Sequence, residues 1–178
     1  MDERQAAGFR GLVWCPDSNY FLLGQTAEVR ELKNKTKIAF GTDSTLTSSW
    51  FARDHFNCAL KSGHVNEVEL FEMLTKNAVD LFGLNDTGSL KEGMKADIVI
   101  LNKNHQLFEH GPEDIQLTFH KGKIVEADES FEKYIESTRF SRVRIGKKIK
   151  LVYGDLTSLL MSIRKIYPEA MIPFSLIE

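Results

Sequence analysis

The stretch KIAFGTDSTL, residues 37–46, joins a short apolar run to a small polar loop. The run over 37–40 stops at Gly41, which is typical of a buried strand that ends at a turn residue. Asp43 follows directly. Enzymes with parallel strands place their sites where those strands end, and a carboxylate there suits metal ligation or proton transfer. The alternative is that Asp43 only caps the turn.

The flanking sequence predicts a second strand parallel to the first. Residues 12–15, LVWC, form a continuous apolar run. Residues 17–19 read as a turn, and 26–32 read as a helix with Thr26 as its N-cap. A helix is also expected over 2–10. This alternation of helix and strand is the pattern of a parallel sheet with crossover helices.

Two longer helices are expected next, followed by a change to β structure. Residues 48–63 carry apolar positions at helical spacing, and so do 66–82, where Asn66 and Glu69 have the spacing of a capping box. After Gly88 the pattern alternates, with strands expected at 97–101 and 115–120. The sequence therefore predicts an α/β segment over 1–88 and a β-rich domain with a C-terminal helix over 89–178.

Composition excludes few functional classes. The chain has 178 residues, a net charge of −2 and two cysteines without CxxC spacing. No apolar stretch approaches the roughly 20 residues of a membrane helix, so a cytoplasmic protein that binds neither membrane nor nucleic acid is expected. A basic segment over 139–150 is interpreted as a solvated strand face, because no aromatic residues alternate with it.

Several short blocks resemble one known family. WCPDSN at 14–19, FGTDS at 40–44, TKNA at 75–78, FGL at 82–84, GSL at 88–90 and GMKADIV at 93–99 resemble, in order and spacing, the C-terminal part of the metal-dependent amidohydrolases. That family includes the cytosine, guanine and triazine deaminases. The blocks run from residue 1 to about 128, and the last ~50 residues match less well.

The resemblance implies a fold and a site. The expected fold is the C-terminal portion of a TIM barrel, strands seven and eight with their helices, followed by part of a small β-sandwich domain. It implies that Asp43 is a ligand of a catalytic zinc or iron and exchanges protons with the metal-bound water. Ser18 and Asn19 would lie near a small-molecule substrate. The complete enzyme would hydrolyse C–N bonds, as a deaminase or cyclic amide hydrolase.

The same comparison exposes a gap. The family's His-x-His and its two further histidine ligands have no counterpart among the five histidines of this chain. A metal site needs three or four protein ligands. The chain alone is therefore expected to hold no metal and to be inactive, and to self-associate or bind an N-terminal segment. The alternative is a non-catalytic scaffold or interaction module that lacks the metal site.

Two other side chains could take part in chemistry. His55 follows Asp43 and could approach it, although a partly exposed helix histidine is the preferred interpretation. Cys15 has no paired histidine in its apolar run, which favours a buried, inert thiol.

Overall fold

A computed structural model describes residues 9–103 and 105–177. The chain has a mixed α/β layout and divides into two compact units, one comprising 1–94 with 107–109, the other 95–106 with 110–178. The domain boundary expected at 88–89 stays a prediction. The helix expected over 2–10 falls mainly outside the described residues.

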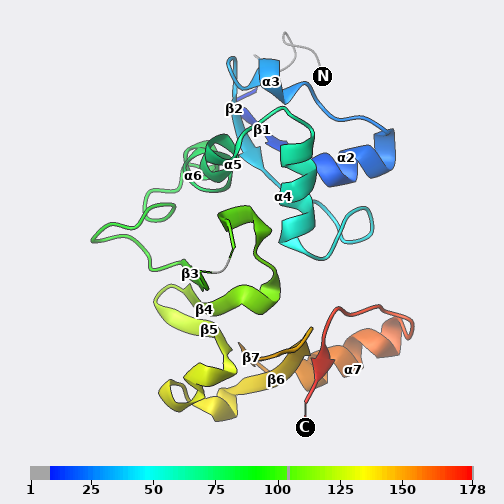
Figure 1. Cartoon of the computed structure of the whole chain (residues 1–178), viewed down its shortest axis with the longest axis vertical. Coiled ribbons are helices and arrows are strands. Elements are labelled where there is room, and N and C mark those ends of the chain that lie inside the picture. Colours follow the sequence, from blue (N-terminus) through cyan, green and yellow to red (C-terminus); the bar gives the residue numbers. More distant parts are fainter. Residues whose placement is uncertain (1–8, 104, 178) are drawn as a thin grey trace. The chain divides into compact units, whose positions relative to one another are not determined.

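Within its described part, the first unit contains a parallel strand pair, five α-helices and a short 3-10 helix at Leu107–Glu109; Figure 1 shows the strands and the α-helices. Its elements are β1 (Gly11–Trp14), α2 (Pro16–Leu23), α3 (Val29–Leu32), β2 (Lys37–Phe40), α4 (Ala52–Lys61), α5 (Glu67–Leu74) and α6 (Lys76–Phe82). No helix among the described residues is long and apolar enough to cross a bilayer.

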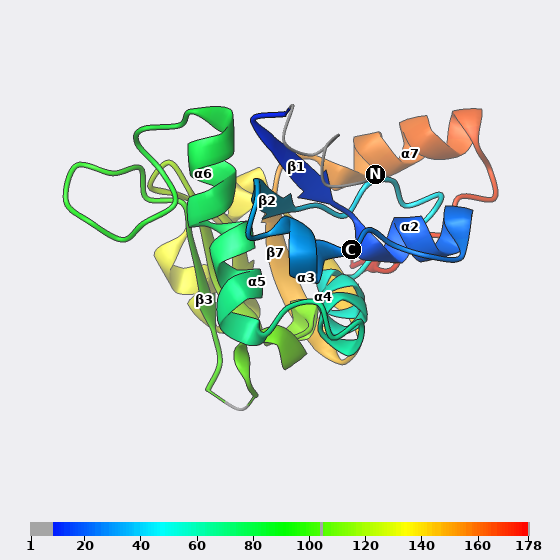
Figure 2. The same cartoon turned by 90° about the horizontal axis from the view of Figure 1, so that it is seen from above.

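Strands β1 and β2 pair in parallel, as predicted, and lie side by side in both views (Figures 1 and 2). Gly11 is opposite Lys37 and Trp14 is opposite Phe40. The Gly41 N–H extends the ladder by donating to the Trp14 carbonyl at 2.9 Å. This register brings the residues that follow the two strands, around Cys15 and Asp43, to the same end of the sheet.

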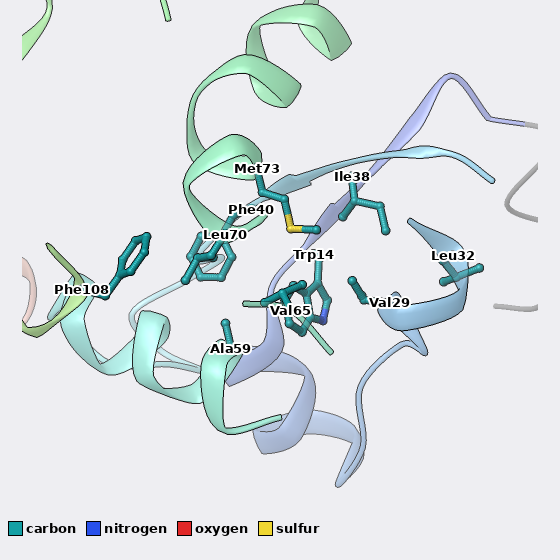
Figure 3. Close-up of a cluster of buried hydrophobic side chains, with 10 residues drawn as sticks. All are labelled: Trp14, Val29, Leu32, Ile38, Phe40, Ala59, Val65, Leu70, Met73 and Phe108. Carbon is teal, nitrogen blue, oxygen red and sulfur yellow. The ribbon is translucent and has the colours of Figure 1, made fainter. Parts of the chain in front are cut away.

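The core of this unit lies between the strand pair and the helices (Figure 3). Ile38 and Phe40 from β2 are buried with Trp14 from β1. Helix α5 contributes Leu70 and Met73, and α4 contributes Ala59. Burying this apolar surface stabilises the pair of short strands, which would be marginal alone.

One turn prediction and two helix predictions need correction. Residues 17–19 are not a turn but lie in α2, because Pro16 occupies its first turn, where a missing N–H is tolerated. Thr26 does not cap a helix over 26–32; its hydroxyl accepts a bond from Trp14 Nε1 at 2.7 Å, and α3 is a single turn that begins after Glu28. Helix α4 begins at Ala52 rather than near residue 48.

The helix expected over 66–82 is broken in two at Thr75. The capping box at its start is confirmed, because Asn66 Oδ1 accepts from the Glu69 N–H and Glu69 accepts from the Asn66 N–H. Thr75 takes φ −119° and ψ −90°, and its hydroxyl donates to the Phe71 carbonyl at 2.7 Å. Such back-bonding competes with the helical ladder and bends helices.

The second unit is built on a six-stranded sheet of order β3-β4-β5-β7-β6-β8. Its strands are Ile98–Leu101, Ile115–His120, Lys123–Asp128, Phe140–Ile145, Lys148–Tyr153 and Ser175–Leu176, and helix α7 spans Leu156–Ile166. Strands β4 and β5 pair antiparallel as a hairpin. Lys121 and Gly122 both have positive φ, the conformation of the favoured two-residue turns.

The basic segment over 139–150 is only partly a solvated face. Lys150 was expected at the surface but is fully buried, where its Nζ donates to the Ile115 carbonyl and lies 3.3 Å from Asp128 Oδ2. Arg142 pairs with Glu129 and Glu132. Carboxylates of the same unit therefore neutralise part of this segment.

Candidate functional site

Asp43 lies just beyond the end of β2 and is exposed. Its φ is +59°, a left-handed conformation that Asp and Asn tolerate better than other residues with a side chain. The Asp in this polar loop thus suits the left-handed backbone conformation that the chain adopts at residue 43.

Ser18 and Asp43, both predicted site residues, are in direct contact. Ser18 Oγ donates to Asp43 Oδ2 at 2.6 Å, although the two residues are 25 positions apart. Ser18 is fully buried in the first turn of α2, and its hydroxyl also shares a hydrogen bond with Thr47 Oγ1 at 2.9 Å. Asp43 Oδ1 has no hydrogen-bond partner among the described residues. One carboxylate oxygen is therefore held and the other is available.

Asn19 takes part in a different contact. Its Oδ1 accepts from the Thr26 hydroxyl at 3.1 Å, and the same hydroxyl accepts from Trp14 Nε1. The amide is thus tied to the strand core, whereas its neighbour Ser18 bonds Asp43. Of the three predicted site residues, the structure joins two and assigns Asn19 a bond to Thr26.

The loop that carries Asp43 is bonded internally. Ser48 Oγ lies 2.9 Å from the Thr42 carbonyl oxygen and 2.7 Å from that of Ser44. The Thr47 N–H donates to the same Ser44 carbonyl at 3.0 Å. These short-range bonds satisfy backbone groups that would otherwise need water, and they restrict the position of Asp43.

Cys15 is half-buried and lies at the start of α2, just after β1, rather than within the strand. Burial raises the pKa of its thiol, and the negative charge of Asp43 raises it further. A hydrogen bond from the Asp43 backbone acts in the opposite direction. The expectation of an inert thiol agrees with this environment, because the thiolate is the reactive form.

His55 is not the exposed helix residue that was expected. It is 2% exposed, and its Nε2 lies 2.8 Å from the Ser49 carbonyl oxygen. Its Nδ1 lies 3.6 Å from Asp17 Oδ2. Asp17 in turn accepts from the Ser49 N–H at 2.9 Å. His55 lies four residues before the buried Ala59, and that spacing is the sequence signal for its burial.

The donor set does not fit a complete metal site. No group of three or more His, Cys, Asp or Glu side chains that could hold a metal occurs within residues 9–103 and 105–177. At the end of β2 the chain offers the Asp43 carboxylate, with Ser18 bonded to one of its oxygens. A single carboxylate is one ligand of the three or four that zinc requires.

Sequence comparison links most of the chain to one family. The model of the amidohydrolase family matches residues 4–125. A 5-methylthioadenosine/S-adenosylhomocysteine deaminase of Dictyoglomus turgidum is 30% identical over 108 residues, covering 55% of this chain and 25% of that protein. A 5'-deoxyadenosine deaminase of Methanosphaera stadtmanae is 35% identical over 99 residues, covering 50% and 23%.

Structural comparison agrees at the level of fold. E. coli guanine deaminase superposes with a TM-score of 0.57 at 19% identity, over 70% of this chain and 36% of that one. The chain spans about a quarter of the length of the curated relatives it matches. The family match covers the strand pair, the Ser18–Asp43 contact and the first strands of the second unit. The chain belongs to the amidohydrolase family.

Proposed function

We propose that this chain supplies the C-terminal part of a metal-dependent deaminase and that Asp43 is its catalytic carboxylate. The observation that carries the proposal is the Ser18–Asp43 hydrogen bond, which leaves Asp43 Oδ1 available at the end of a parallel strand. Strands β1 and β2 would be strands seven and eight of a TIM barrel. The second unit would belong to the accompanying β domain.

The reaction class follows from the relatives. The two curated relatives are named for deamination of adenosine-type compounds, and the structural relative is named for guanine. The proposed reaction is hydrolysis of the bond between a ring carbon and an exocyclic nitrogen. Water adds its oxygen to the carbon. One of its protons goes to the adjacent ring nitrogen and the other to the amino group, which leaves as ammonia.

Asp43 has a defined task in this scheme. Its Oδ1 takes a proton from the attacking water and returns it to the departing nitrogen, as a general base and then a general acid. Ser18 donates to Oδ2 and so orients the carboxylate. Zinc or iron would supply a water of lowered pKa when bound. The described residues do not complete a site for it, so the remaining ligands would come from a segment outside this chain.

A second candidate is favoured by that incomplete ligand set. A non-catalytic module would keep the scaffold and lack the metal site, as found among the described residues. The two candidates differ in one requirement. Only the deaminase needs the charge of Asp43, whereas the module needs only the folded surface.

Turnover in the presence of the missing ligands tests the proposal. The polypeptide that carries the histidine ligands is joined to or mixed with residues 1–178, and ammonia release from adenosine-type nucleosides and guanine is measured. Asp43→Asn is expected to abolish release while the circular dichroism spectrum is unchanged, because Asn tolerates the left-handed backbone but has no basic oxygen. The matched control is Asp80→Asn, which removes an exposed carboxylate from α6. Near-normal turnover by Asp43→Asn refutes the catalytic role.

A further inference from the structure

The loop between β2 and α4 is attached to the start of α2 at two places. The first is the contact of Ser18 with Asp43 and Thr47. The second is at Ser49, whose peptide N–H donates to Asp17 Oδ2 at 2.9 Å. The adjacent residues Asp17 and Ser18 thus hold the two ends of the loop segment that begins with Asp43.

His55 holds the other side of the same residue. Its Nε2 lies 2.8 Å from the Ser49 carbonyl oxygen. A carbonyl oxygen only accepts, so Nε2 must carry a proton. The N–H of Ser49 is therefore bonded to Asp17 while its C=O is bonded to His55, and the main chain at this point is held from both directions.

The remaining ring nitrogen faces the Asp17 carboxylate. Nδ1 is buried, has no hydrogen-bond partner among the described residues, and lies 3.6 Å from Asp17 Oδ2. A separation of 3.6 Å is too long for a hydrogen bond, and with the proton on Nε2 the Nδ1 atom is an acceptor, as the carboxylate oxygen is. Asp17 and His55 are therefore linked through the Ser49 main chain, which both of them bond, and not by a hydrogen bond to each other.

We propose that Asp17 and His55 are a pair of positioning residues: they hydrogen-bond the peptide N–H and C=O of Ser49 and thereby hold the loop that carries Asp43 in place. Neither residue is bonded to Asp43, so neither is a catalytic residue. Without these two residues, the loop stays tied to the start of α2 through its first part, where Asp43 and Thr47 bond Ser18 and the Asp43 backbone bonds the Cys15 thiol. The effect on turnover rests on the proposed function, whereas the anchoring itself does not.

The anchoring is measured by amide hydrogen exchange and NMR on the 178-residue chain. Asp17→Ala is expected to accelerate exchange of the Ser49 amide roughly tenfold or more, because that amide loses a charged acceptor. Asp17→Asn keeps a side-chain oxygen and is expected to restore most of the protection. His55→Gln keeps a donor for the Ser49 carbonyl and is expected to disturb the loop less than His55→Leu. A His55 ring resonance from an Hε2 proton is expected.

The matched control is Asp54→Asn. Asp54 accepts from the Ser49 hydroxyl rather than from its peptide, so its substitution is expected to leave the Ser49 amide unchanged. Unaltered Ser49 exchange in Asp17→Ala, or a ring that carries its proton on Nδ1 alone, overturns the proposal. If Asp17→Ala or His55→Leu fails to fold, Asp17→Asn decides. Its amide oxygen is a weaker acceptor than a carboxylate, so exchange at Ser49 must be measurably faster than in the parent chain, and unaltered exchange overturns the proposal.

Activity separates this proposal from the one on which it builds. In the complete assembly, His55→Leu is expected to lower kcat with KM nearly unchanged, because Asp43 is displaced rather than removed. If the variants alter amide exchange at Ser49 but no assembly shows turnover, the anchoring of Ser49 by Asp17 and His55 is supported and the deaminase proposal is not. If the assembly turns over substrate but Asp17→Ala leaves amide exchange at Ser49 unchanged, the deaminase proposal is supported and the anchoring of Ser49 is overturned.

Discussion

The Cys15 thiol reports on the charge of Asp43. Burial raises the pKa of this thiol, and the Asp43 carboxylate raises it further. Asp43→Asn removes the negative charge, which should lower the pKa of Cys15 and speed its alkylation by iodoacetamide at mildly alkaline pH. Cys58 is an internal control, because its pKa is raised by burial and Asp17 rather than by Asp43. Equal acceleration at both cysteines, read by mass spectrometry, would instead indicate general loosening.

Single residues also show where prediction from sequence stops. Asp43 at the end of a strand was evident from the abrupt change of KIAF to GTDS. Its bond to Ser18 depends on strand register, which brings together two positions 25 apart. Thr26 illustrates the opposite case. Its local capping preference was outweighed by a bond to Trp14, a partner that no local pattern identifies.

At the scale of elements, the pairing of β4 with β5 partly buries the carboxyl group of Glu126. Thr118 lies opposite Glu126, and the Thr118 hydroxyl donates to Glu126 Oε2 at 3.1 Å. Burial raises the pKa of Glu126, although that bond and the charge of Lys150 oppose the shift. A raised pKa in the folded state means that this group favours folding only while protonated, and that the contribution is lost as pH rises through the folded-state pKa.

Glu126→Gln is therefore expected to stabilise the chain at neutral pH. Gln mimics the protonated acid and avoids burying a charge, so the urea midpoint should rise. The gain should vanish below the ordinary carboxyl range, where Glu126 is protonated in both states. Asp128→Asn is the matched comparison, and it is expected to change stability in the opposite direction. Burial alone would raise the pKa of Asp128, but bonds from Ser130 and Lys150 outweigh it and lower the pKa. Its substitution should destabilise at neutral pH, and a shift of the same sign in both variants would contradict this account.

Secondary-structure elements differ in how well the sequence predicts them. The hairpin at Lys121-Gly122 and the capping box at Asn66 were predictable, because both depend on neighbouring residues. The order of the six-stranded sheet was not predictable in the same way. Strand β5 pairs with β7 rather than with β6, the next strand along the chain, and such non-local pairing follows from burial and not from a turn signal.

For the whole molecule, the main feature is an open parallel sheet in the first unit. Parallel strands are usually covered on both faces and flanked by further strands. Here the described sheet has two strands, so each has one edge without a strand partner. Val13 on β1 is 51% exposed, and the adjacent helix α2 exposes a group of large apolar side chains: Tyr20, Phe21, Leu22 and Leu23. An apolar surface next to unpaired strand edges is a template for association.

The isolated chain is therefore expected to self-associate, or to bind the polypeptide that supplies the remaining ligands. Sedimentation velocity from low to high micromolar concentration should show a rising average mass. Val13→Lys places a charge on the open strand and should shift the chain toward monomer, because charged side chains protect edges. Val68→Lys is the matched control, since Val68 is also an exposed valine but lies on helix α5 and not on a strand edge. The polypeptide that carries the histidine ligands should reduce self-association when it is added, if it binds the same surface as a second copy of the chain. A well-folded monomer at every concentration, or equal effects of the two lysine variants, would mean that the open edge is not the contact.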